Sequence, residues 1–200
     1  MKRLVYLISP NKIYKNFYTD LNKVLKFKNV KHFQLRLKKT PKYKIIQIAK
    51  KIKTITKRHR VNLIINDSAI IASIIRADGC HIGKLDGTFA DTKKYIKNKI
   101  IGVTCHNSKT LAQKALKDKA TYVAFGSFYK SKLKPKAKKA DLKILMWAKK
   151  KIRKPIVAIG GITDKNYKKL IIAGANYIAI SSFIWDNPVL KPELAIRKFK

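Results

Sequence analysis

Cysteine, acidic residues and long apolar runs are all scarce in this 200-residue chain. The two cysteines, Cys80 and Cys105, are too few for a disulfide framework and lack metal-ligand spacing, which predicts a reducing, cytoplasmic location. No apolar run approaches the roughly 18 residues that cross a bilayer, so we expect no integral membrane protein. The apolar run after Lys2-Arg3 ends at Pro10 without the small residues that signal cleavage needs, and it is interpreted as a first strand.

The shortage of acids leaves a large positive charge. Lys and Arg number 48 against 10 Asp and Glu, for a formal net charge of +38. Such a charge raises nucleic acid or an anionic membrane as partners. However, 41 of the cations are lysines spread along the whole chain, whereas Arg is the residue favoured for bidentate recognition of phosphates and bases. The chain also contains no recognised RNA-binding motif or aromatic stacking run.

We therefore expect phosphorylated small molecules as partners, and neither nucleic acid nor a membrane. A non-catalytic basic barrel that binds anionic polymers remains an alternative, and the sequence is compatible with a homo-oligomer.

Short β-branched runs alternate with Lys-rich stretches of helical periodicity from end to end. This alternation indicates βαβ units and a parallel sheet. About eight repeats in 200 residues predict one α/β domain over residues 1–200, a (β/α)₈ TIM barrel with outer helices. An open doubly wound sheet is the alternative. The expected strands cover residues 4–9, 32–37, 62–67, 79–83, 100–105, 122–128, 155–161 and 177–182.

Three local signals refine the connections. Asn107-Ser108 and Thr163-Asp164 are each typical of a helix N-cap. The Lys-rich segment 129–140 is longer than most connections in compact barrels, and such loops are often binding loops or lids.

Active sites of (β/α)₈ barrels lie at the carboxyl ends of the strands, so polar residues there are candidates. Gln34, Arg36 and Lys38 alternate with leucines at the end of the second expected strand, which places them on one face. An inward Arg is costly unless it meets an anion. That anion is either a substrate or the carboxylate of Asp67 or Asp86.

Asp67, after Asn66, and Asp86 follow neighbouring strands. Two such carboxylates can share a Mg²⁺ ion, which prefers oxygen ligands, water and substrate phosphates. Alternatively, each aspartate caps the helix that follows it.

The last quarter of the chain carries a more specific signal. Gly160-Gly161 ends the seventh strand and Ser181-Ser182 ends the eighth, the two places from which barrels build a phosphate site. Bare turns would also explain the glycines.

Four more residues complete the rim of the expected site. His106 is a candidate acid or base, or orients a loop. His81 is expected to pack inside a strand, and Cys105 has no evident base and is not expected to be a nucleophile. The rim residues are Thr104, His106, Ser131 and Lys134.

Together these motifs resemble the thiamine-phosphate synthase family and its thiazole-tautomerase relatives. The matching segments, among them NLIINDSAIIASIIRADGCHIGKLD and PIVAIGGITDKN, keep the family's order from about residue 4 to residue 185. The resemblance implies a Mg²⁺-dependent transferase that joins an aminopyrimidine methyl diphosphate to a thiazole ethyl phosphate and releases diphosphate.

The resemblance also implies roles for single residues. Asp67 and Asp86 would hold Mg²⁺ on the diphosphate. The pyrimidine diphosphate would contact Gln34, Arg36, Lys38, Asn66, Thr104 and Lys134, of which Arg36, Lys38, Thr104 and Lys134 are the expected catalytic residues. The thiazole phosphate would contact Ser131, Gly161, Ser181 and Ser182.

The chain departs from the family pattern in four places. Leu37 replaces an acid between Arg and Lys, and Lys84-Leu85 replaces a Gln-acid pair before the second aspartate. Thr104 replaces a serine, and Ser131-Lys132-Leu133 lacks one hydroxyl of a Thr-x-Thr element. The altered sixth loop and His106 keep open a thiazole tautomerase, an isomerase that would use the same pocket without diphosphate chemistry.

Overall fold

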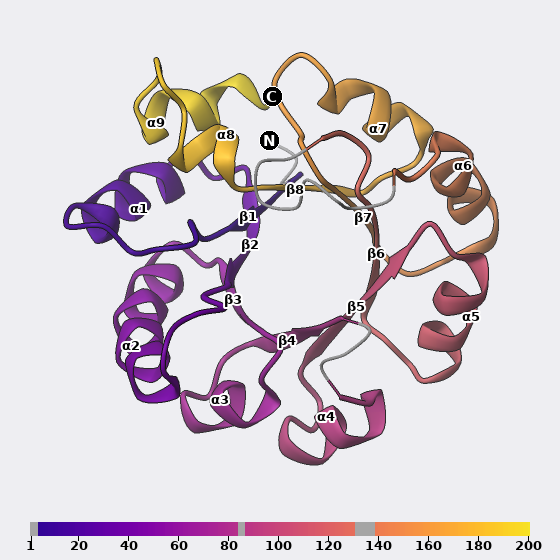
Figure 1. Cartoon of the computed structure of the whole chain (residues 1–200), viewed down its shortest axis with the longest axis horizontal. Coiled ribbons are helices and arrows are strands. Elements are labelled where there is room, and N and C mark those ends of the chain that lie inside the picture. The colour runs from indigo at the N-terminus through magenta and orange to yellow at the C-terminus, as the bar shows by residue number, and fades with distance from the viewer. Residues whose placement is uncertain (1–3, 84–86, 131–138) are drawn as a thin grey trace.

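The strands of the protein close into a barrel surrounded by helices (Figure 1). The computed structural model describes residues 4–83, 87–130 and 139–200. Each strand pairs in parallel with the next in sequence, and β1 pairs with β8 to complete the ring. The (β/α)₈ prediction is confirmed, and the open doubly wound sheet is excluded.

The bounds of the elements follow the predicted alternation. The strands are β1 (Val5–Ile8), β2 (Val30–Leu35), β3 (Asn62–Asn66), β4 (Gly79–Ile82), β5 (Ile100–His106), β6 (Tyr122–Gly126), β7 (Ile156–Ile159) and β8 (Tyr177–Ile180). The helices are α1 (Phe17–Leu25), α2 (Lys42–Arg58), α3 (Ala69–Ile74), α4 (Phe89–Tyr95), α5 (Lys109–Lys117), α6 (Leu142–Lys151), α7 (Tyr167–Ala173), α8 (Ser182–Trp185) and α9 (Pro192–Ala195), followed by the 3₁₀ helix η1 (Ile196–Lys198).

The strands bury both of their faces, in two different cores. Residues such as Val5, Leu7 and Phe33 face outward and pack in the large core shared with the helices. Their neighbours in sequence face the barrel axis and form a second, smaller cluster. That inner cluster consists of Tyr6, Ile8, Ile64, Tyr122, Ala124, Val157 and Ala179.

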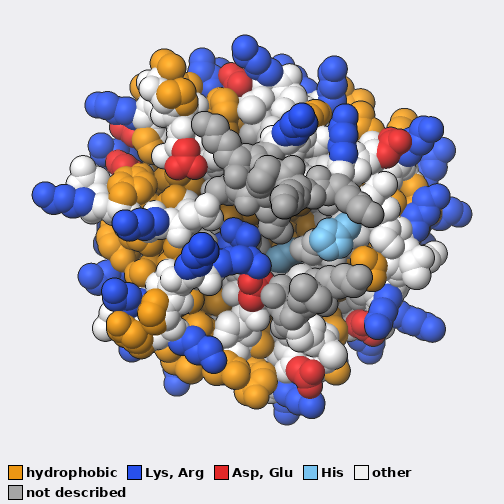
Figure 2. Space-filling model, viewed as in Figure 1, with side chains coloured by type: hydrophobic (Ala, Val, Ile, Leu, Met, Phe, Trp, Pro, Cys, Tyr) orange, Lys and Arg blue, Asp and Glu red, His pale blue; other side chains and the backbone are white. Residues whose placement is uncertain are grey.

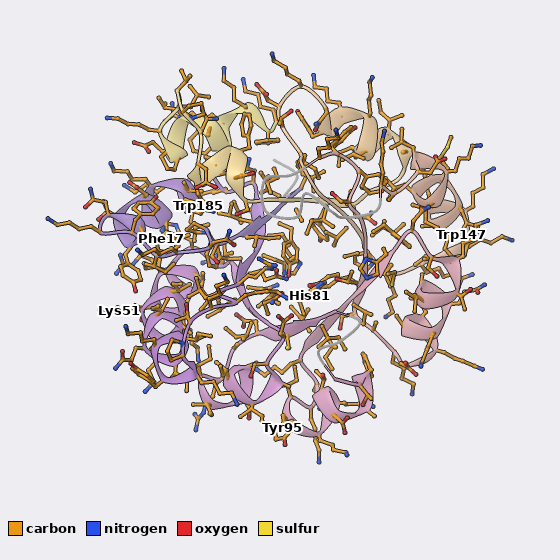
Figure 3. The ribbon with its side chains drawn as sticks, viewed as in Figure 1. Phe17, Lys51, His81, Tyr95, Trp147 and Trp185 are labelled. Atoms are coloured by element: carbon orange, nitrogen blue, oxygen red, sulfur yellow. The ribbon has the colours of Figure 1, made fainter. Side chains whose placement is uncertain are left out.

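Large polar rings cross the inside of the barrel. Tyr122 lies with its ring centroid 5.6 Å from that of Tyr6 and 5.7 Å from that of His81. Gly102 on the neighbouring strand makes room for the Tyr122 ring, because a Cβ atom there would overlap the ring. Figure 3 shows His81 directed from β4 toward the barrel axis.

Side-chain caps fix where several helices begin. Ser108 Oγ accepts a hydrogen bond from the Leu111 amide at 3.2 Å, so the N-cap predicted at Asn107-Ser108 is confirmed. The N-cap predicted at Thr163-Asp164 is wrong, because α7 begins only after Asn166. The Asn166 side chain instead accepts from the Thr163 amide at 2.9 Å, which closes a turn before the helix. Among the described residues, no helix is long and apolar enough to cross a membrane.

Candidate functional site

The predicted site residues that the structure describes lie at or just beyond the carboxyl ends of the strands. On the face shown in Figure 2, Lys and Arg side chains, an acidic side chain and histidine gather near the barrel axis. We call this end of the barrel the mouth. Asp86, Ser131 and Lys134, together with Lys84-Leu85 and Lys132-Leu133, lie outside the described residues.

The second strand ends earlier than predicted, and this changes the setting of Arg36. Because β2 stops at Leu35, Arg36 does not lie within the strand, where it was expected. Arg36 instead lies in the loop, where its amide donates to Ser9 Oγ at 2.9 Å. Its guanidinium also donates to Asn11 Oδ1 at 3.4 Å. Arg36 as a whole residue is half-buried, and its guanidinium hydrogen bond to Asn11 is exposed, so an anionic ligand can reach it without entering the apolar core.

The two ends of the polar set on this strand differ in depth. Gln34 is only 3% exposed and donates through Nε2 to the Tyr6 hydroxyl at 3.0 Å. Lys38 is exposed, and its Nζ lies 3.5 Å from Asp67 Oδ2. The side chains of Lys38 and Asp67 are 51% and 30% exposed, so this ion pair is accessible to a competing ligand and contributes little stability.

Asp67 directly follows β3 and has an unusual backbone conformation. Its φ is +65°, a left-handed value that Asp tolerates better than most residues. The Asp67 amide donates to the His81 carbonyl at 2.8 Å, which ties the residue to the neighbouring strand. The cap of α3 is Ser68, whose Oγ accepts from the Ile71 amide. The alternative role of Asp67 as a helix cap is therefore wrong.

The donor set at the mouth fits a hard divalent cation. Among the residues described, no group of three or more His, Cys, Asp or Glu side chains is placed to hold a metal ion. Mg²⁺ does not require such a group, because it commonly takes one or two carboxylates and fills its other positions with water and substrate phosphates. The accessible Asp67 carboxylate meets that need, whereas the pairing with Asp86 lies outside the described residues.

His81 does more than pack inside its strand. The side chain is buried, with 8% exposure. Its Nδ1 lies 2.8 Å from the Tyr122 hydroxyl and its Nε2 lies 2.7 Å from Thr104 Oγ1. The Tyr122 hydroxyl in turn lies 2.7 Å from that of Tyr6. Sequence reasoning missed both tyrosines, although each stands at an inward position of its strand.

The residues after Thr104 have contrasting environments. A register irregularity between Thr104 and His106 leaves Cys105 out of the pairing with β6. Cys105 is fully buried, and burial raises the pKa of its thiol to about 12. The thiol therefore stays protonated near neutral pH, in agreement with the expectation that it is not a nucleophile. His106 is exposed at the strand end with a φ of +52°.

The glycine pair after β7 forms a tight turn. Gly161 has a φ of +58°, and a Cβ atom there would collide with the Lys130 carbonyl and the Tyr129 side chain. Tyr129 donates its amide to the Gly160 carbonyl at 3.1 Å, and Asn166 Nδ2 donates to the Gly161 carbonyl at 3.0 Å. A hollow of about 590 Å³ adjoins this turn and is lined in part by Tyr129 and Asn166. The turn thus needs glycine for steric reasons.

The serine pair after β8 is divided between two positions. Ser181 is buried, and its hydroxyl donates to the Ser9 carbonyl at 2.9 Å, which joins β8 to the end of β1. Ser182 is the first residue of α8. Of the two serine hydroxyls, that of Ser181 is therefore the one that donates to the Ser9 carbonyl.

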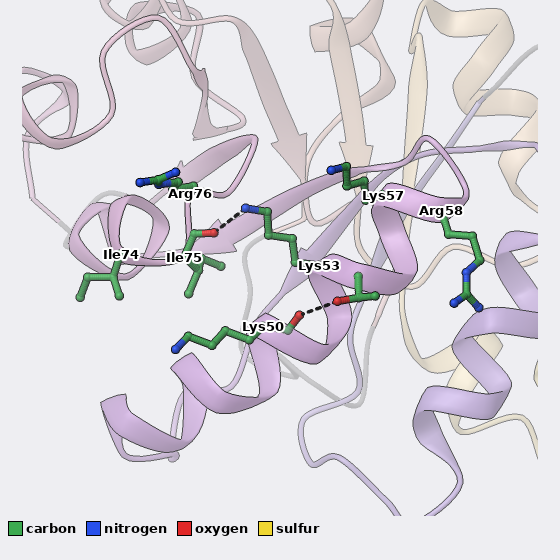
Figure 4. A pocket seen from close by; sticks show the side chains of 8 residues that line it. Lys50, Lys53, Lys57, Arg58, Ile74, Ile75 and Arg76 are labelled. Carbon is green, nitrogen blue, oxygen red and sulfur yellow. Dashed lines mark hydrogen bonds between the residues drawn. The ribbon is translucent and has the colours of Figure 1, made fainter.

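A second basic hollow lies outside the barrel, between α2 and the end of α3 (Figure 4). It has a volume of about 740 Å³, and Lys53 Nζ on one wall donates to the Ile75 carbonyl at 2.8 Å. We call it the outer groove. Its lining residues are Lys50, Lys53, Thr54, Lys57, Arg58, Ile74, Ile75 and Arg76.

The fold and the mouth define a class of protein: a (β/α)₈ barrel with a basic, acid-containing site at the carboxyl ends of its strands. Within that class, residues 5–184 match the model of the thiamine monophosphate synthase family. The chain belongs to this family.

Individual relatives agree with the family match. The chain is 52% identical to the thiamine-phosphate synthase of Pelagibacter ubique over 200 residues, covering 100% of this chain and 97% of that protein. It is 37% identical to that of Erythrobacter litoralis over 188 residues, covering 92% and 88%. A thiamine phosphate pyrophosphorylase from Pyrococcus furiosus has the same fold, with a TM-score of 0.87, 23% identity, and coverage of 98% of this chain and 93% of that one.

Proposed function

We infer that the protein catalyses the reaction named for its family, the synthesis of thiamine phosphate. An aminopyrimidine methyl diphosphate loses diphosphate, which departs with the electron pair of the broken C–O bond. The ring nitrogen of a thiazole ethyl phosphate then supplies the electron pair of the new C–N bond. Neither bond change needs a nucleophile from the protein, and this agrees with the protonated, buried state of Cys105.

The observation that carries the proposal is the charge arrangement at the mouth. Lys38 and Asp67 lie 3.5 Å apart on neighbouring strand ends, and Arg36 lies two residues before Lys38. Negative charge develops on the diphosphate as the C–O bond breaks, and fixed cations stabilise that charge most at the transition state. When Mg²⁺ is bound by Asp67 and Asp86, it would neutralise part of the same charge.

The remaining residues divide between the two substrates. Gln34, Asn66, Thr104 and Lys134 are assigned to the pyrimidine diphosphate by the resemblance. Gly161 and Ser182 are assigned to the thiazole phosphate, for which an accessible turn with glycine backbone is well suited. Ser131 and Ser181 complete that set. With the Ser181 hydroxyl donated to Ser9, we assign Ser181 the positioning of the β8 end.

We retain the other expectations as part of the proposal. The partners are phosphorylated small molecules, the location is the cytoplasm, and a homo-oligomer is compatible with the sequence. Neither nucleic acid nor a membrane is required by the reaction.

The test is the formation of thiamine phosphate and diphosphate from both substrates, with and without Mg²⁺, for the wild type and for Asp67→Asn. We expect Mg²⁺-dependent product and a loss of at least about 100-fold in the variant, because metal stabilisation of transition-state charge is worth several kcal/mol. Asp118→Asn is the matched control, because Asp118 follows the last residue of α5 and is not one of the mouth residues. Absence of product from folded wild type would reject the synthase, and isomerisation of the thiazole in the presence of a chelator would support a tautomerase instead.

A further inference from the structure

A chain of buried hydrogen bonds runs through the interior of the barrel to Thr104. Its links join Gln34 Nε2 to Tyr6 at 3.0 Å, Tyr6 to Tyr122 at 2.7 Å, and Tyr122 to His81 Nδ1 at 2.8 Å. The last link joins His81 Nε2 to Thr104 Oγ1 at 2.7 Å. The chain crosses five strands, and only its final member stands among the candidate catalytic residues.

The donors along this chain follow from its first link. The Gln34 amide group donates to the Tyr6 oxygen, and an amide nitrogen cannot accept a hydrogen bond in return. Within the described part of the chain, the Tyr6 hydroxyl has one other polar partner, the Tyr122 hydroxyl. Tyr6 must therefore donate to Tyr122, since a buried hydroxyl proton without an acceptor is costly.

The same reasoning passes the direction on to the histidine. Tyr122 accepts from Tyr6, so its own proton goes to His81 Nδ1. Burial raises the pKa of both tyrosines above the ordinary value, and each therefore keeps the one proton that this scheme assigns to it. With Nδ1 as an acceptor, the neutral ring carries its hydrogen on Nε2 and donates to Thr104.

We propose that Tyr6, Tyr122 and His81 are positioning residues that oblige the Thr104 hydroxyl to accept from His81 and to donate its own proton into the mouth. The ligand of this donor is an anionic phosphate oxygen, which under the proposed function is an oxygen of the departing diphosphate. A donor oriented in advance, next to a buried network, stabilises developing charge without reorganising when the bond breaks. Within this hydrogen-bonded chain Thr104 is the catalytic residue, and Tyr6, Tyr122 and His81 act through it.

The tautomer of His81 can be measured without any substrate. In protein labelled with ¹⁵N-histidine, long-range ¹H–¹⁵N correlations distinguish a ring with hydrogen on Nε2 from one with hydrogen on Nδ1, and His81→Asn assigns the signals. We expect the Nε2–H tautomer in the wild type and a mixture of the two in Tyr122→Phe. Tyr177→Phe removes the hydroxyl of another inward tyrosine, which packs on His32 and takes no part in the chain. It should leave the wild-type pattern unchanged.

The role of Thr104 is tested by a double-mutant cycle. Tyr122→Phe should lower kcat about tenfold with little change in KM, the effect of one lost hydrogen bond at the transition state. In a Thr104→Val background the same substitution should cost less than about twofold, because its effect is transmitted through Thr104. Thr104→Ser keeps the hydroxyl and should retain most of the activity.

Binding of inorganic diphosphate in the presence of Mg²⁺ provides the same cycle without turnover. If the protein makes no thiamine phosphate, the proposed function is overturned, and the diphosphate-binding cycle still tests the role of Thr104. Two results would overturn the present inference: an Nδ1–H tautomer in the wild type, or equal costs of Tyr122→Phe in the Thr104 and Thr104→Val backgrounds.

Discussion

The mouth of the barrel and the outer groove are both basic hollows, yet they are built differently. At the mouth, Lys38 lies beside the Asp67 carboxylate, and a buried hydrogen-bond chain ends at Thr104. The described lining of the outer groove carries five cations and no acid, and its apolar part is Ile74 and Ile75. Positive charge alone attracts anions. The comparison indicates that a catalytic site also needs groups held in place by neighbours, and these occur at the mouth.

The largest effect should come from the backbone of the mouth. Gly161→Ala is expected to destabilise the protein by about 3 kcal/mol and to abolish most activity, because the added Cβ meets the Lys130 carbonyl at a left-handed φ. Gly87→Ala is the control, since Gly87 has a φ of +100° but no atom of the described residues within 4 Å of its added Cβ. Urea unfolding of both variants measures the difference. Equal losses would mean that backbone conformation, and not the packed turn, sets the cost.

The next largest effect should appear when one lysine from each hollow is replaced and the losses in kcat/KM are compared. Lys38→Ala should lower kcat/KM by about ten- to 100-fold, since a hydrogen bond to a charged group is worth roughly 1.5–3 kcal/mol. Lys57→Ala, in the outer groove, should change it less than about twofold. Steady-state kinetics at one fixed ionic strength provides the comparison. A comparable loss in Lys57→Ala would mean that the overall positive field, and not local placement, governs catalysis.

A histidine in the barrel interior, His32, should make the free energy of unfolding depend on pH. Burial, assisted by Lys31, lowers the pKa of His32 from 6.5 to about 4. The unfolded chain therefore binds a proton on His32 at a pH where the folded protein does not, so stability falls as pH decreases from about 6.5 toward 4. The loss attributable to His32 between pH 7 and 4.5 should be about 2 kcal/mol.

Urea unfolding of the wild type and of His32→Gln at both pH values isolates this contribution from that of the carboxylates. The variant should lose less stability on acidification than the wild type. Identical pH dependence in the two proteins would show that His32 titrates normally in the fold.

The barrel could be predicted because apolar residues recur at helical spacing between the short β-branched runs, and both patterns follow from burial. Strand positions were accurate to a few residues, and the largest consequence of an error was at Arg36, which lies beyond β2. Tyr6 and Tyr122 could not be paired from sequence, because their contact depends on the register across a closed ring. Thr163 looked like the cap of α7, but the helix begins only after Asn166, whose side-chain oxygen accepts from the Thr163 amide in the turn before it. The predicted roles of Asp86, Ser131 and Lys134 stay predictions.

The smallest predicted effect concerns the outer groove and has the opposite sign. Lys50 and Lys53 stand three residues apart on α2, where like charges repel. Lys50→Glu should therefore raise the free energy of unfolding by about 0.3–0.5 kcal/mol at low salt, because a Glu placed before Lys on a helix is favourable. The gain should disappear near 1 M salt, where screening is nearly complete.

Urea unfolding at both salt concentrations measures this gain, with Lys50→Gln as the control that removes charge without reversing it. Activity should be unchanged in both variants, since neither alters the mouth. A loss of stability in Lys50→Glu would mean that the cations of the outer groove are themselves held in a favourable arrangement. The mouth and the outer groove would then differ in which groups contact their cations, and not in whether those cations are held in place.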